Sequence, residues 1–166
     1  MKKLFFTLIA VFATSLASLA QITLSDAYTS LAQLPGMSAK STSTVQIDGS
    51  ATINNAKTVS VSTNNVGAMR NQFFYMIESL PLRNQLIGAN NQRELASVFA
   101  EPAGNGMYNV LVMKGNALTG TFTATSGQTN KAGIDAISNC ELTMDSDELV
   151  LTPTTSSTGD FISMTR

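Results

Sequence analysis

Alternation of apolar and polar residues with a period of two constrains the fold of this chain more than any other feature. From Leu118 to Thr125 every second residue is a threonine, and the residues between are apolar or glycine. Val45–Ile53 and Lys57–Thr63 alternate in the same way. A period of two is typical of a β-strand with one buried face and one solvated face. The pattern predicts a mainly antiparallel sheet whose Ser, Thr and Asn face meets water.

Turn residues divide these segments into predicted hairpins. Asn54-Asn55 is the expected turn of the first hairpin, and Lys114-Gly115-Asn116 is the expected turn of a second one, because Asn and Gly tolerate turn conformations. Residues 81–92 fit a helical turn, a loop or a short strand, and the sequence does not decide between them. Strands are expected in four further segments: Arg93–Pro102, Ala136–Met144, Leu149–Pro153 and Asp160–Arg166.

Two segments have the spacing of amphipathic helices instead. The first lies within Thr23–Met37, where Thr23 or Ser25 is suited to cap the helix and Pro35-Gly36 ends it. The second begins after Asn64 or Asn65 and ends before Pro81. Its apolar stripe comprises Val66, Met69, Phe73, Ile77 and Leu80. Together these elements predict an α+β fold, a mainly antiparallel sheet with two helices packed on one face.

The first 20 residues match a secretory signal peptide. Lys2 and Lys3 precede a short apolar core, and Ser18-Leu19-Ala20 is a typical cleavage pattern. The alternative is an uncleaved membrane anchor, but the apolar run is shorter than the roughly 20 residues that a spanning helix needs. We therefore expect a signal peptide at 1–20, a single α+β domain at 21–166 and a periplasmic or extracellular location, with no membrane insertion after cleavage.

Composition excludes several function classes. The chain has no histidine, so Ser-His and Cys-His nucleophiles are ruled out. Of ten Lys and Arg residues, eight remain without Lys2 and Lys3, against 11 acidic residues, which gives a net charge of −3. The basic residues are scattered, so no nucleic-acid partner is expected. No cofactor motif is present either, since the Gly-rich stretches lack the Gly-Lys-Ser/Thr phosphate signature.

The segment from Ile137 to Pro153 holds the most reactive-looking residues. Cys140, the single cysteine, alternates in phase with Leu142 and Met144, which favours a place in the core over a reactive thiol or an intermolecular disulfide. Asp145, Asp147 and Glu148 form a calcium candidate. The candidate is weak, because an EF-hand loop has Gly at its sixth position and Glu at its twelfth, and this segment has neither there. A hairpin turn is the favoured interpretation of this acidic cluster, and no metal or catalytic residue is assigned.

Adjacent aromatic residues in the second helix suggest a partner surface. Phe73 lies on the apolar stripe, whereas Phe74 and Tyr75 extend beyond it. Interfaces are enriched in Tyr and Phe, so Phe74 and Tyr75 are the candidate contact residues for a partner. Paired carboxylates offer an alternative, hydrolytic chemistry, but no spacing singles out a pair.

The order of these segments resembles that of small exported α+β proteins of an uncharacterised family from Gram-negative bacteria. The resemblance rests on layout: a signal ending just before Gln21, a short helix, a hairpin, an apolar helix and a β-rich C-terminal half. It implies no activity and no site residues. We expect an exported, non-enzymatic binding domain for an unknown protein or carbohydrate. The alternatives are a secreted hydrolase with paired carboxylates and a structural subunit that associates through a sheet edge.

Overall fold

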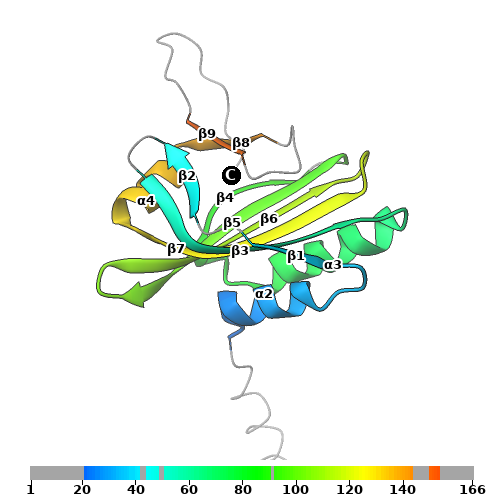
Figure 1. Cartoon of the computed structure of the whole chain (residues 1–166), viewed down its shortest axis with the longest axis horizontal. Coiled ribbons are helices and arrows are strands. Elements are labelled where there is room, and N and C mark those ends of the chain that lie inside the picture. Colours follow the sequence, from blue (N-terminus) through cyan, green and yellow to red (C-terminus); the bar gives the residue numbers. More distant parts are fainter. Residues whose placement is uncertain (1–20, 42–43, 49–50, 91, 144–149, 154–166) are drawn as a thin grey trace, which may run out of the picture.

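The computed structural model describes residues 21–41, 44–48, 51–90, 92–143 and 150–153, and within them the fold is α+β with a dominant sheet. A seven-stranded antiparallel sheet curves through the molecule, with helices and a two-stranded hairpin around it (Figure 1). Its strands are β1 (Ser38–Ser41), β2 (Thr44–Asp48), β3 (Ala51–Ser62), β4 (Gln85–Asn90), β5 (Glu94–Gly104), β6 (Met107–Asn116) and β7 (Thr121–Asn130). The other elements are α2 (Leu24–Ala32), α3 (Val66–Ser79), the 3-10 helix η1 (Leu82–Asn84), α4 (Lys131–Ser138) and the hairpin β8 (Cys140–Thr143) and β9 (Val150–Pro153).

The strand order is β1-β3-β7-β6-β5-β4. β2 pairs with the first residues of β3, on the same side of β3 as β1. β1 and β4 are therefore the first and last strands of the order. The segment 81–92, which the sequence left open, contains η1 and the edge strand β4. β5 confirms the strand that was predicted at Arg93–Pro102.

The first two helices begin and end close to where the sequence predicts. The Thr23 hydroxyl accepts a hydrogen bond from the backbone N–H of Asp26 at 3.1 Å, which satisfies a free donor in the first turn of α2. Met69 and Phe73 of the predicted stripe are buried in α3, which ends before Pro81. None of the helices in the described part of the chain has the length and apolar character needed to span a bilayer.

Two separate apolar clusters lie on opposite faces of the sheet, as alternate residues of β6 show. Leu111 and Met113 belong to the first cluster, and Val110 and Val112 belong to the second. Successive side chains of a strand point to opposite faces, so the sheet separates the clusters. α2 and α3 supply buried residues to the first cluster, and α4 supplies Ile134 and Ile137 to the second. Figure 1 shows α4 and the β8–β9 hairpin across the sheet from α2 and α3.

Burial on both faces corrects the prediction of a solvated threonine face. Thr125 is only 2% exposed and Thr129 only 1% exposed. Their hydroxyls stay bonded inside the protein: Thr125 Oγ1 lies 2.9 Å from Thr58 Oγ1, and Thr129 Oγ1 donates to the carbonyl of Thr52 at 2.7 Å. A buried hydroxyl needs such a partner to offset its lost hydration. Threonine is compatible with both environments, so alternation alone did not distinguish them.

Neither of the two segments predicted as turns from Asn and Gly is a turn in the structure. β3 runs without interruption through Asn54-Asn55, and its register with β7 shifts between Asn54 and Lys57. Asn55 adopts a φ of 53°, so its tolerance of the left-handed region serves an irregularity within the strand instead of a turn. β6 likewise continues through Asn116, and the chain reverses over 117–120.

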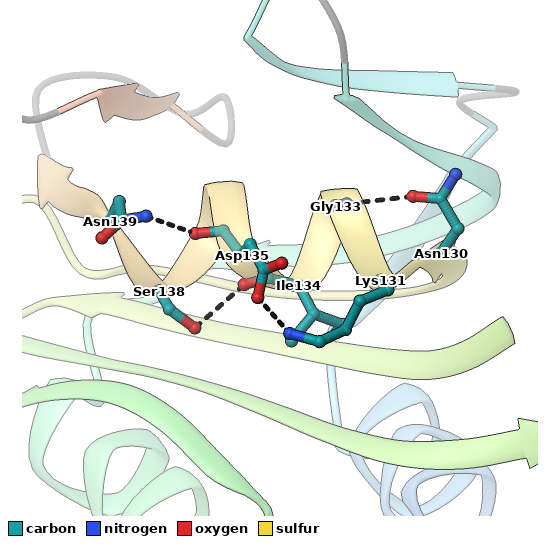
Figure 2. A network of polar contacts seen from close by, with 7 residues as sticks. All are labelled: Asn130, Lys131, Gly133, Ile134, Asp135, Ser138 and Asn139. Carbon is teal, nitrogen blue, oxygen red and sulfur yellow. Dashed lines mark hydrogen bonds and ion pairs between the residues drawn. The ribbon is translucent and has the colours of Figure 1, made fainter. Parts of the chain in front are cut away.

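A third helix replaces the start of the strand predicted at Ala136–Met144. α4 follows β7 directly, and the Asn130 side chain caps it by accepting from the backbone N–H of Gly133 at 3.0 Å (Figure 2). Lys131 and Asp135 form an ion pair one turn apart, and this contact is the largest cause that raises the pKa of Lys131. Within the described part of that segment, the strand is Cys140–Thr143, and the Cys140 side chain lies outside what the structure describes.

Candidate interaction surface

A small hollow lies where α3 ends and the edge strand β4 begins. Its volume is about 240 Å³, and four of its six lining residues are apolar. Typical pockets for small molecules measure about 300–1,000 Å³, so this hollow suits a single side chain better than a cofactor. The lining residues are Ile77, Glu78, Leu80, Leu82, Gln85 and Phe99.

The chain between α3 and β4 sets the position of the hollow. The backbone N–H of Leu80 donates to the carbonyl of Ile77 at 3.3 Å, and the Ser79 hydroxyl donates to the carbonyl of Met76 at 2.7 Å, which closes the last turn of α3. Pro81 cannot continue the helix, and one turn of η1 then leads into β4. Each lining side chain thus comes from a residue in a helix or strand, or from the residue that caps α3.

Gln85 ties the hollow to the sheet. Its side-chain nitrogen donates to the Ser97 hydroxyl of β5 at 2.8 Å, while Gln85 itself pairs with Phe99. This hydrogen bond is available because Gly88 has no side chain: a Cβ at Gly88 would lie 2.3 Å from the Gln85 side-chain nitrogen. The absence of a side chain at Gly88 therefore leaves the space that the Gln85 amide occupies.

Two large apolar side chains are exposed in this region. Tyr75 is 66% exposed and Leu82 is 80% exposed, while Phe74 is half-buried and its ring centroid lies 6.3 Å from that of Tyr75. Phe74 precedes Ile77 and Glu78 by three and four positions, so it is a neighbour of both on the helix surface. Phe74 and Tyr75 remain a prediction as partner-contact residues. Leu118 in the β6–β7 turn is a third exposed apolar residue, at 73%.

Charges of opposite sign lie at the two ends of this surface. Glu78 is exposed at the hollow, beside the first residue of β4. Arg70, two turns earlier on α3, donates to the Asn90 side-chain oxygen at 2.7 Å at the last residue of β4. α3 therefore runs in the opposite direction to β4, with its acidic residue at the start of the strand and its basic residue at the end.

Two of the described carboxylates, those of Asp26 and Glu101, lie at the start of α2. Asp26 and Glu101 both bind the first turn of α2: Asp26 accepts from the Thr23 hydroxyl at 2.7 Å, and Glu101 accepts from the Leu24 N–H at 3.4 Å. Acidic groups stabilise a helix N-terminus, which accounts for both residues. No group of three or more potential metal ligands occurs in the described residues. The calcium candidate Asp145, Asp147 and Glu148 lies outside them.

Among the sheet residues whose burial the structure describes, Lys114 is the most deeply buried charged one. It is 6% exposed on β6, between Ala96 of β5 and Thr123 of β7, on the face of the second cluster. A buried ammonium needs compensating groups. Lys114 does have an interaction partner, so it is not an open binding site.

The sequence identified part of this surface and missed the rest. Leu80 and Ile77 were expected on the apolar stripe, but Leu82, Gln85 and Glu78 were not connected with it. The available signal was the leucine directly after Pro81, because Pro81 ends the helical stripe and Leu82 then begins the separate turn η1. Comparison with protein-family models, with curated proteins and with solved structures finds no match to this chain.

Proposed function

We propose that this protein is an exported, non-enzymatic interaction domain that binds an extended segment of another protein. The observation that carries the proposal is the hollow of about 240 Å³ with exposed Leu82 in its lining. Exposed Tyr75 lies three positions before Glu78, another lining residue, and is therefore its neighbour on the surface of α3. In this proposal α2 and α3 form the layer that covers one face of the sheet, and the end of α3 presents the contact residues. One large apolar side chain of the partner fills the hollow, and Tyr75 and Leu82 close around it.

The chemistry of the surface defines the partner. Ile77, Leu80, Leu82 and Phe99 favour an aromatic or branched aliphatic side chain in the hollow. Glu78 at the rim favours a basic residue nearby, because opposite charges across an interface support correct placement. A protein partner is favoured over a carbohydrate, since the walls of the hollow are mostly apolar.

A peptide titration tests this proposal. The probe is a short fluorescent peptide of Thr and Ser with one central Phe and a Lys two positions away, followed by fluorescence polarisation. Leu82→Ser and Tyr75→Ser should each weaken binding about tenfold, or ~1.4 kcal/mol, which is above the cost of truncating most interface residues.

Leu118→Ser is the matched control, because it removes another exposed leucine at a distant turn. A peptide with Ser in place of Phe should bind at least tenfold more weakly than the original. Equal binding of the two peptides, or an equal loss with Leu118→Ser, would refute the proposed site.

A further inference from the structure

The two edges of the sheet differ in how well they are protected. Natural edge strands avoid pairing with other chains through charged side chains, prolines or bulges. The edge strand β1 carries Lys40 and is four residues long. β4, with the sequence QLIGAN, has no charged residue and no proline. Its register is irregular between Gln85 and Ile87 but regular from Ile87 to Asn90.

The regular part of β4 is also open to another strand. Gly88, Ala89 and Asn90 are exposed, and their side chains are small or absent. Among the strands that the structure describes, β4 pairs with β5 alone. Backbone N–H and C=O groups alternate in direction along a strand, so every second residue of β4 directs these groups away from β5, the direction in which a further strand would pair.

Charge along this edge selects a particular partner. Arg70 reaches Asn90 at the end of β4, with 2.7 Å between its nitrogen and the side-chain oxygen. Glu78 lies at the hollow with Gln85, the first residue of β4. A second strand that carries the same two charges in reverse order would meet opposite signs at both ends. An antiparallel copy of this chain has that order.

We propose that two copies of this chain associate through β4, which pairs antiparallel with itself about a two-fold axis at Gly88. Directly opposite residues in an antiparallel pair share one face, so an axis perpendicular to the sheet places a residue opposite its own copy. With Gly88 on the axis, Asn90 lies opposite Leu86 of the second copy. Arg70 of each copy is then level with Glu78 of the other. By the two-fold symmetry, the Asn90–Leu86 pair and the Arg70–Glu78 pair each occur twice in the dimer.

This association uses Glu78, which also lines the hollow, but it leaves the apolar walls of the proposed peptide site uncovered. The axis is perpendicular to the sheet, so the two copies of α3 lie on the same side of the extended sheet. Both hollows then lie on that side too, and each remains complete within its own chain. A dimer would present two identical binding sites to one partner or surface.

Sedimentation equilibrium of the purified protein over a range of concentrations tests the dimer. The protein should show a monomer–dimer equilibrium. Ala89→Lys should raise the dimer dissociation constant at least tenfold, because two added ammonium groups meet beside the axis. Ala39→Lys is the matched control: it adds the same charge at an exposed alanine of the opposite edge strand, β1, and should leave the constant unchanged.

Charge reversal tests the register. Arg70→Glu and Glu78→Arg should each weaken the dimer, and the double variant should restore it, since the signs are then exchanged. A monomer at every concentration, loss of the dimer in Ala39→Lys but not Ala89→Lys, or a double variant no better than the single ones would each overturn the proposal. Monomeric Ala89→Lys should still bind the fluorescent peptide, so failure of the dimer is distinguishable from failure of the proposed function.

Discussion

Phe73 and Tyr75 lie two residues apart on α3 and should respond very differently to truncation. Phe73 is fully buried in the first cluster, and its ring centroid lies 5.4 Å from that of Phe122 at an interplanar angle of 54°. Replacing a core Phe by Ala costs about 3–5 kcal/mol, from lost apolar burial and the cavity that remains. A tilted aromatic pair accounts for about 0.5–1.5 kcal/mol of this. A domain of ordinary stability has about 5–15 kcal/mol in total, so Phe73→Ala should remove a large part of it.

Tyr75→Ala is the control on the same helix. Its side chain is mostly exposed, and surface substitutions usually change stability by less than about 0.5 kcal/mol. Urea unfolding followed by far-UV circular dichroism measures the free energy of unfolding of both variants. If the slope of this free energy against urea concentration is unchanged, the unfolded states are comparable. If Phe73→Ala does not fold, Phe73→Leu provides a milder change at the same position.

A double-mutant cycle isolates the contact between the two rings. Phe73→Leu, Phe122→Leu and the double variant should give a coupling of about 0.5–1.5 kcal/mol. Equal destabilisation by Phe73→Ala and Tyr75→Ala would show that α3 is not docked on the first cluster as described. A coupling of zero would show that the contact between the two rings does not itself stabilise the protein, while the burial of Phe73 still would.

Three further predictions concern other elements. Asn130→Ala should destabilise the protein by about 0.5–2 kcal/mol in urea unfolding, because α4 loses its N-cap, while Asn130→Asp should retain most of the stability. Gly120→Ala should cost more than about 1 kcal/mol, since φ is 69° there and a Cβ would lie 2.2 Å from the Thr63 carbonyl oxygen; no loss would place the turn elsewhere. Burial raises the pKa of Tyr28, and the hydrogen bond to its neighbouring carboxylate raises that of Lys131, so both groups bind protons more tightly when folded. Their stabilisation is present below about pH 10 and is lost as the pH rises through the folded pKa values; a melting temperature that rises above pH 10 would contradict this sign.

The fold class and the first two helices could be predicted because each rests on local chemistry. The Thr23 cap and the Pro81 stop act within a few residues, and the stripe through Met69 and Phe73 has one buried face. The α+β class follows from the same local patterns. These signals do not require knowledge of what packs against them.

Elements that depend on distant contacts were predicted less well. Thr125 and Thr129 are buried because a second layer covers their face, and no pattern within β7 indicates that layer. Asn55 was assigned to a turn because positive φ is common in turns, although the same conformation also occurs at strand irregularities. α4 was missed because Ile134 and Ile137 are only two apolar positions, too few to outweigh the strand-like segment that follows.

The candidate site was predictable only in part for a related reason. Phe74 and Tyr75 stand out as neighbouring aromatics, but the hollow forms between α3, η1 and the first residues of β4. Its walls come from Phe99 of β5 as well, 22 positions after Ile77 along the chain. The spacing of residues along the chain does not show that these elements lie next to one another, because the register of the sheet determines it.

The position of the sheet between two apolar clusters has a consequence for redesigning this protein. Side chains on opposite faces, such as Leu111 and Val112, belong to different clusters and pack against different helices. Effects of substitutions at sites without shared partners usually add. Each half of the interior can therefore be rebuilt on its own, with the other half holding the backbone in place. The proposed binding surface at the end of α3 could be diversified in this way while the α4 side is kept as a constant support.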